Sequence, residues 1–138
     1  MMKKILLLCI VIGAIVVSIG ILRFNQKKNR PSTKTIEVSG ITINNPWKNA
    51  VDIEPGEKPV LTKNEKYRIV FQPKYNLVLI TILATPYQDV RKEAEQDLLN
   101  QLGVSKEEAC KLNVSVGSPY FANKEVITDS SRLSFCSK

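Results

Sequence analysis

The stretch that decides the fold is YRIVFQPKYNLVLITILATPYQDVRKEAEQDLLNQLG, residues 67–103. In its first six residues, 67–72, every second residue is apolar (Tyr67, Ile69 and Phe71), which is typical of a strand with one buried side. Residues 77–84 are apolar on both faces apart from Thr81, which predicts a central strand. Residues 73–76 (PKYN) have the length of a hairpin loop. The stretch therefore predicts two antiparallel strands followed by a helix.

The helix carries signals at both of its ends. Thr85 is suited to cap the N-terminus, with Pro86 as the first helical residue and Gln88 completing a capping box. Gly103 has the place of a helix-ending residue in the left-handed conformation. The apolar stripe consists of Tyr87, Val90, Ala94, Leu98, Leu99 and Leu102, and the opposite side of Arg91, Lys92, Glu93, Glu95 and Asp97. We expect the apolar stripe to pack on the sheet and the charged side to face solvent.

The part of the chain before this stretch has weaker patterns. Residues 35–43 alternate with a change of phase at Gly40, which predicts one strand with a bulge. Residues 44–63 contain three prolines and predict a long irregular stretch. Within it, residues 54–57 (EPGE) have the composition of a turn.

The part after the helix predicts three further elements. Residues 105–111 open with a second capping box and predict a short helix. Residues 112–117 alternate and predict a strand, and residues 132–136 predict a last strand. The order is β-ββ-αα-β-β. The expected fold class is α+β, with an antiparallel sheet and one long and one short helix in two layers.

The N-terminus carries a run of 18 uncharged residues, 5–22, directly behind Lys3 and Lys4. A helix of this length nearly spans the hydrocarbon core of a bilayer, so residues 1–23 predict a transmembrane anchor. A cleaved signal peptide is the alternative, with a candidate cleavage site at residues 18–20. The count of basic residues on the two flanks slightly favours a cytoplasmic domain, whereas the very short N-terminus favours a single-pass signal anchor with the domain on the outer side of the cell membrane.

The net charge of +7 is concentrated beside the predicted anchor. Residues 1–30 hold six basic and no acidic residues, whereas the rest holds 14 basic and 13 acidic residues. Positive charge in this place suits anionic lipid head groups, and we expect no nucleic acid among the partners. Residues 24–34 then predict a basic juxtamembrane linker, which leaves residues 35–138 as a single α+β domain.

The residue types narrow the chemistry. The chain contains no histidine, which removes Ser-His-Asp and Cys-His triads and nearly all catalytic zinc sites. It also has no Gly-rich phosphate-binding motif. We therefore expect a non-enzymatic protein without catalytic residues, metal or cofactor. A carboxylate-based hydrolase is an alternative, although capping explains the pair Glu107 and Glu108, and a solvated helix face explains Glu93 and Asp97.

Two of the three cysteines lie in the predicted domain. Cys9 belongs to the apolar run and acts there as a small apolar residue. Cys110 ends the short helix and Cys136 lies beside Phe135 near the C-terminus. We expect a Cys110–Cys136 disulfide that ties the last strand to the helix pair, which suits an oxidising compartment. Two buried free thiols are the alternative.

Aromatic residues in two loops form a candidate interaction surface. Trp47, the only tryptophan, lies in the first loop, and Tyr120 and Phe121 are adjacent in the second. Tryptophan and tyrosine are enriched at interaction hot spots. The alternative for Trp47 is that it folds back and caps the core.

The last third of the chain has a recognisable pattern. Its elements are Leu-Gly at 102–103, Ala-Cys at 109–110, Asn-Val-Ser-Val-Gly at 113–117, Pro-Tyr-Phe at 119–121 and Leu-Ser-Phe-Cys at 133–136. This pattern resembles small single-pass bacterial proteins of unassigned function, and the resemblance implies no activity and no site residues. The predicted anchor and the missing catalytic residues favour a membrane-anchored interaction or accessory protein of the bacterial cell envelope. A small-ligand or peptide-binding extracytoplasmic module, which uses the sheet edge or the two loops, is the alternative.

Overall fold

The computed structural model describes residues 30–123 and 132–136. The predicted anchor, residues 1–23, lies outside these ranges. No helix in the described ranges is long and apolar enough to cross a membrane. The contacts group Ser32–Lys138 into one unit, and the fold below is that of its described part.

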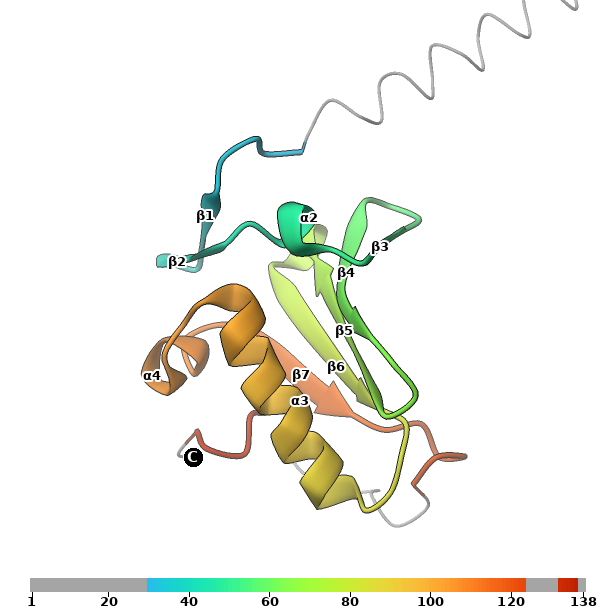
Figure 1. Cartoon of the computed structure of the whole chain (residues 1–138). Coiled ribbons are helices and arrows are strands. Elements are labelled where there is room, and N and C mark those ends of the chain that lie inside the picture. Colours follow the sequence, from blue (N-terminus) through green and yellow to red (C-terminus); the bar gives the residue numbers. More distant parts are fainter. Residues whose placement is uncertain (1–29, 124–131, 137–138) are drawn as a thin grey trace, which may run out of the picture. The chain divides into compact units, whose positions relative to one another are not determined.

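Seven short strands and three helices make up this part of the chain (Figure 1). The strands are β1 (Thr35–Val38), β2 (Ile41–Asn44), β3 (Asp52–Glu54), β4 (Lys58–Lys63), β5 (Tyr67–Gln72), β6 (Leu77–Ile82) and β7 (Asn113–Gly117). The helices are α2 (Pro46–Asn49), α3 (Tyr87–Leu102) and α4 (Lys106–Ala109), with a 3-10 turn η2 (Pro73–Tyr75) between β5 and β6. Strands β3 to β7 form one sheet in that order, and β1 and β2 pair separately. The predicted α+β class is confirmed.

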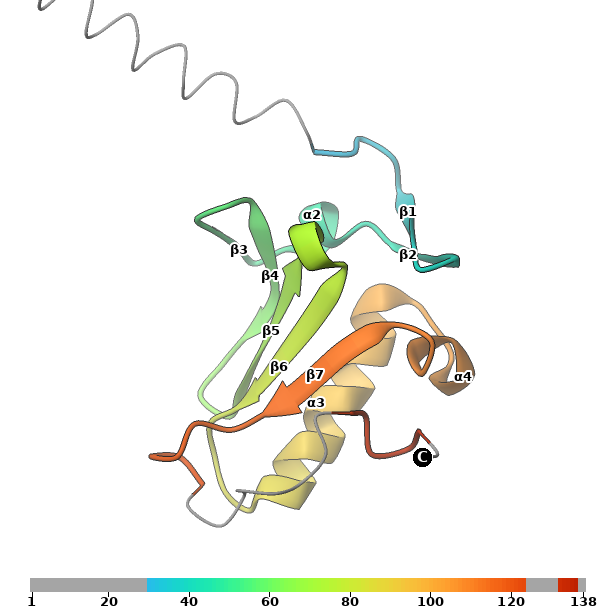
Figure 2. The same ribbon diagram turned by 180° about the vertical axis from the view of Figure 1, so that it is seen from behind.

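The main sheet is mixed, which corrects the prediction of an antiparallel sheet. Strands β3 to β6 are antiparallel neighbours. Strand β7 runs parallel to β6, with Asn113 opposite Leu77 and Gly117 opposite Thr81. The cause is α3, whose 16 residues carry the chain back to the end of the sheet where β6 begins. Strand β7 is therefore an edge strand, and Figure 2 shows it in front of α3.

The first part of the domain is more regular than its sequence suggests. Residues 35–43 form the hairpin of β1 and β2 rather than one bulged strand, because Ser39 and Gly40 both adopt positive φ and reverse the chain. The stretch 44–63 contains α2, β3 and β4 and is not irregular throughout. The predicted turn at residues 54–57 is confirmed and joins β3 to β4. These elements have three to six residues, which is too short to show a clear period.

The core lies between the sheet and α3. It is built from Tyr67, Ile69 and Phe71 of β5, Val78, Ile80 and Ile82 of β6, and Val90, Ala94, Leu98 and Leu102 of α3. Burial of each large apolar side chain contributes about 1.5–3 kcal/mol to stability. This packing fixes α3 against the sheet, and α3 in turn positions the C-terminal residues.

Residues 132–136, the C-terminal segment, do not form the predicted last strand. The segment turns on itself, and the N–H of Cys136 donates to the carbonyl oxygen of Leu133 at 3.2 Å. Leu133 points into the core, as predicted, with 3% of its surface exposed. Side chains of α3, rather than a neighbouring strand, accept and donate the hydrogen bonds that hold this segment, as the next subsection describes.

The ends of α3 follow the predicted signals in part. The helix begins at Tyr87, with Pro86 rather than Thr85 at the N-cap position and no side-chain cap. At the other end Gly103 adopts the predicted left-handed conformation, with φ at 66°. The N–H of Val104 then donates to the carbonyl oxygen of Leu99 at 3.2 Å, which ends the helix.

Replacing Gly103 by alanine is expected to lower the free energy of unfolding by about 2 kcal/mol. A side chain is strained at this φ, and its Cβ would lie 2.7 Å from Nδ2 of Asn44. Urea unfolding measures the loss. Gly40→Ala is the matched control, since Gly40 also has positive φ but no atom lies within 4 Å of its Cβ position. A loss for Gly103→Ala no larger than that of the control would contradict the contact with Asn44.

Candidate functional site

A buried ion pair on α3 holds the C-terminal segment. Nε of Arg91 donates to Oε1 of Glu95 at 2.9 Å, and the two side chains are only 2% and 3% exposed. Both oxygens of Glu95 also accept from Ser134, with the backbone N–H of Ser134 at 2.7 Å from Oε1. Nη2 of Arg91 donates to the carbonyl oxygen of Arg132. The pair therefore fixes the backbone of the segment at two positions.

The burial of Arg91 and Glu95 corrects the prediction that they face solvent. The sequence contains a pattern that is consistent with the burial of these two residues. Arg91 follows Tyr87 by four residues, and Glu95 precedes Leu98 by three, so both lie at the border of the apolar stripe. The pattern does not reveal the C-terminal segment that covers them, because this segment lies about 40 residues later in the chain.

The predicted disulfide between Cys110 and Cys136 is present, which confirms that prediction. The two Cα atoms are 5.6 Å apart and the cysteines are 26 positions apart. Cys110 directly follows α4, so the bond ties the end of the C-terminal segment to this helix. The segment is thus held by hydrogen bonds at Arg132 and Ser134 and by a covalent bond at Cys136.

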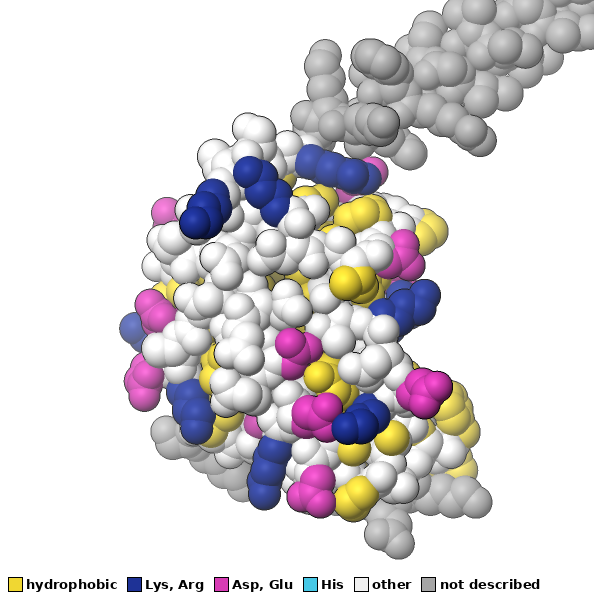
Figure 3. All heavy atoms as spheres, in the orientation of Figure 1, with side chains coloured by type: hydrophobic (Ala, Val, Ile, Leu, Met, Phe, Trp, Pro, Cys, Tyr) yellow, Lys and Arg dark blue, Asp and Glu magenta, His cyan; other side chains and the backbone are white. Residues whose placement is uncertain are grey.

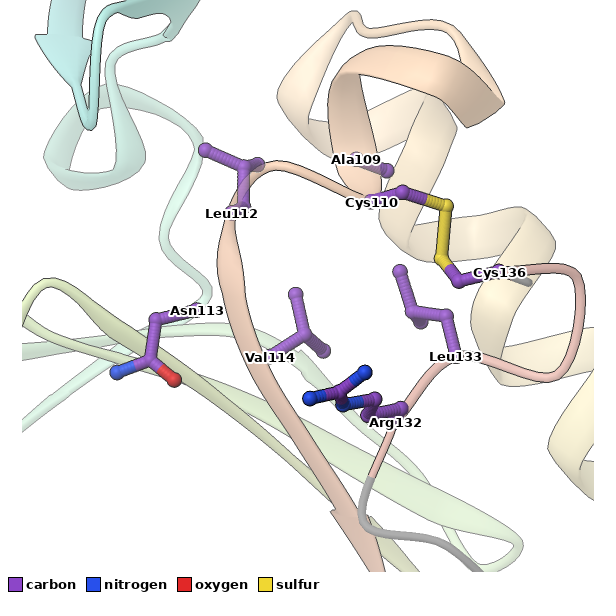
Figure 4. A pocket seen from close by; sticks show the side chains of 8 residues that line it. All are labelled: Ala109, Cys110, Leu112, Asn113, Val114, Arg132, Leu133 and Cys136. Atoms are coloured by element: carbon purple, nitrogen blue, oxygen red, sulfur yellow. A yellow bond between two sulfur atoms is a disulfide. The ribbon is translucent and has the colours of Figure 1, made fainter. Parts of the chain in front are cut away.

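A cavity of about 360 Å³ opens between β7, the end of α4 and the C-terminal segment (Figure 4). We call it the β7-edge groove. It is lined by Ala109, Cys110, Leu112, Asn113, Val114, Arg132, Leu133 and Cys136. In Figure 4 the side chain of Arg132 reaches from the C-terminal segment toward β7. Arg132 is exposed, and within residues 30–123 and 132–136 its guanidinium has no carboxylate partner. The groove thus combines a free cation with an edge strand.

The second site is the turn after β7, residues 118–123, which we call the aromatic turn. Tyr120 is 68% exposed and Phe121 is 81% exposed. Two polar side chains hold the base of the turn. Oγ of Ser118 donates to the carbonyl oxygen of Ile82 at 2.8 Å, and Nδ2 of the buried Asn123 donates to Oγ of Ser118 at 2.8 Å. The turn therefore presents two adjacent aromatic side chains on a fixed base.

Trp47 lies at the other end of the sheet from the aromatic turn. Its ring meets Phe71 edge-to-face, with centroids 5.8 Å apart, and packs against the core. Phe71 pairs with Val78 near the start of β6, whereas the aromatic turn follows Gly117, which pairs near the end of β6. The structure therefore brings Tyr120 and Phe121 together but not Trp47, which caps the core as in the alternative interpretation.

The acidic residues singled out in the sequence make structural contacts. Glu93 pairs with Lys66 at 2.9 Å. Asp97 accepts from the hydroxyl of Thr62 at 2.5 Å and from that of Tyr67 at 3.4 Å, which links α3 to the sheet. Burial and the nearby Asp97 carboxylate raise the pKa of Tyr67. No group of three metal-ligating side chains occurs within the described ranges.

The two acidic residues of α4 also have local roles. Glu108 accepts from the N–H of Ser105 at 2.8 Å, and Oγ of Ser105 accepts from the N–H of Glu108, which confirms the second capping box. A backbone hydrogen bond at Glu107, together with one from Ser105, lowers the pKa of Glu107.

On the face seen in Figure 3, acidic and basic side chains are interspersed rather than gathered by sign.

Comparison of the chain with protein-family models, curated proteins and solved structures finds no match to any of them. The β7-edge groove and the aromatic turn are therefore the features from which a function is inferred.

Proposed function

We propose that this protein is a membrane-tethered, non-enzymatic interaction module of the bacterial cell envelope, which binds a protein partner through the aromatic turn. The observation that carries the proposal is the exposure of Tyr120 and Phe121, at 68% and 81%, side by side in sequence. Large aromatic side chains stabilise a fold only when buried. Two adjacent ones in solvent are therefore better explained by binding than by folding.

The base of the aromatic turn supports this proposal. Asn123 is 8% exposed, and its side chain donates to Ser118 and, at 3.4 Å, to the carbonyl oxygen of Ala84. The backbone N–H of Ala122 donates to the carbonyl oxygen of Pro119 at 2.9 Å. A turn held in this way loses little conformational entropy when a partner binds, so more of the contact energy appears as affinity.

The compartment is inferred from two features. The disulfide suits an oxidising environment such as the outer side of a bacterial cytoplasmic membrane. The uncharged run 5–22 suits a single-pass anchor in that membrane. Under this proposal the anchor places the domain close to other envelope proteins, where an exposed aromatic turn finds its partner.

Photo-crosslinking in native membranes tests the proposal. Benzoylphenylalanine at position 121 is expected to capture a recurrent partner. Tyr75 is the matched control, because it is also an exposed aromatic residue, at 59%, but lies on η2 before the start of β6. Tyr120→Ala should lower the yield at position 121 at least about tenfold, as expected for a hot-spot residue. Equal capture of the same protein from positions 75 and 121, or a yield that does not respond to Tyr120→Ala, would contradict the proposal.

A further inference from the structure

The outer edge of β7 is open to pairing in the described part of the chain. Strand β7 is last in the order β3-β4-β5-β6-β7, so only one of its edges is paired. An edge strand presents unpaired N–H and C=O groups, which can bind an added extended chain. The β7-edge groove begins at this edge, with Asn113 and Val114 in its lining.

Arg132 is fixed at the opposite side of the groove. Its carbonyl oxygen accepts from Arg91, and the next residue but one, Ser134, is held by Glu95. The disulfide at Cys136 holds the end of the same segment. These bonds use the backbone of Arg132. Within residues 30–123 and 132–136 no carboxylate pairs with its exposed guanidinium, which can therefore bind an anion. The costly burial of Arg91 and Glu95 thus gives a rigid base to one exposed cation.

The size and charge of the groove indicate what it binds. A volume of about 360 Å³ lies at the lower end of the range for ligand pockets, which suits the end of a chain rather than a long segment. A guanidinium pairs with carboxylates through charge-assisted hydrogen bonds, so the fitting end is a C-terminus and not an N-terminus. Val114, which is half-buried and lines the groove, offers apolar surface to the last side chains.

We propose that the β7-edge groove binds the extended C-terminal end of a partner protein, which pairs with the outer edge of β7 and places its terminal carboxylate on Arg132. This site is separate from the aromatic turn. The groove is lined by Asn113 and Val114 at the start of β7, whereas the aromatic turn follows its end at Gly117. If binding at one of these two sites is disproved, binding at the other can still be tested.

The test uses the full chain in detergent micelles, labelled for NMR, and an N-acetylated tetrapeptide of alternating threonine and valine with a free C-terminal carboxylate. Amide shifts are expected at residues 113–115 and at the Arg132 side chain. The same peptide with an amidated C-terminus should bind about tenfold more weakly or worse, which corresponds to the loss of one charge-assisted hydrogen bond.

Matched variants separate the terminal carboxylate from general charge effects. Arg132→Gln should weaken binding of the free-acid peptide by the same factor. The substitution leaves the backbone contact with Arg91 in place. Lys111→Gln is the control. Lys111 is an exposed cation between the lining residues Cys110 and Leu112, but it does not itself line the groove. An amidated peptide carrying an internal aspartate should not restore binding.

Four outcomes would overturn this proposal. They are equal binding of the acid and amide peptides, binding that survives Arg132→Gln, full binding of the aspartate peptide, and shifts that are absent or confined to residues 118–123. The last outcome would leave the aromatic turn as the binding site. The reverse result, shifts at β7 without partner capture at position 121, would support the groove and reject the function proposed for the turn.

Discussion

Glu95→Ala is expected to lower the free energy of unfolding by about 3–5 kcal/mol. The substitution removes the Glu95 carboxylate that pairs with the guanidinium of Arg91, a side chain only 2% exposed. It also removes the acceptor for the backbone N–H of Ser134. A buried charge that loses its partner is among the most destabilising changes in a protein. Urea unfolding, followed by the fluorescence of Trp47, the only tryptophan of the chain, measures the loss.

The neighbouring pair on α3 provides the control. Glu93 pairs with Lys66 at the surface, where the side chains are 48% and 55% exposed. Because solvent screens such a pair, Glu93→Ala should cost less than about 1 kcal/mol. The double variant Arg91→Met with Glu95→Leu should recover most of the loss caused by Glu95→Ala, since it removes both charges. Equal losses for Glu93→Ala and Glu95→Ala would show that burial of the pair carries no energetic weight.

Elements with local signals were predictable from the sequence. The hairpin of β5 and β6 follows from the alternation in residues 67–72 and the apolar run after it. Gly103 ends α3 as expected, because its left-handed conformation turns the chain so that the N–H of Val104 also reaches the carbonyl oxygen of Leu99. The second capping box, between Ser105 and Glu108, is likewise complete within four residues. In each case the residues that make the contact are neighbours in the sequence, so the pattern contains the whole interaction.

Features that depend on distant segments were not predictable in this way. The alternation of β7 is the same whether it pairs parallel or antiparallel, and only the return path through α3 and α4 sets its direction. Arg91 and Glu95 have the composition of a solvated helix face until residues 132–136 cover them. The β7-edge groove exists only because the same segment lies beside β7, so no short pattern could indicate it.

The candidate interaction residues show the same division. Adjacent aromatic residues at 120 and 121 indicated a surface feature, and both are exposed on a turn whose base the hydrogen bonds of Asn123 hold. Trp47 satisfied the same sequence criterion but packs against Phe71. Composition alone could not separate these two outcomes, because the difference lies in what each ring meets after folding.

Reduction of the Cys110–Cys136 disulfide is expected to lower the free energy of unfolding by about 3.5 kcal/mol, from the chain entropy released over 26 positions. The buried pair still holds Ser134 after reduction, so the C-terminal segment should remain docked while its end opens more often. Hydrogen exchange at the amides of Ser134 and Cys136, which are both hydrogen-bonded, measures this opening. Urea unfolding with and without dithiothreitol measures the total loss.

The disulfide and the buried pair act on the same segment, so their effects should not be additive. When the disulfide is intact, the segment of a Glu95→Ala variant stays near α3 because Cys136 is tethered to Cys110. When both restraints are absent, exchange at the amide of Cys136 should approach the rate of an unprotected amide, since neither bond returns the segment to its place. Dithiothreitol should have no effect on a Cys110→Ala, Cys136→Ala variant, which controls for the reductant. Additive losses in this cycle would mean that the two restraints stabilise different parts of the fold. That result would contradict the inference that both restraints hold the C-terminal segment, and with it the inference that Arg132 is rigidly placed in the groove.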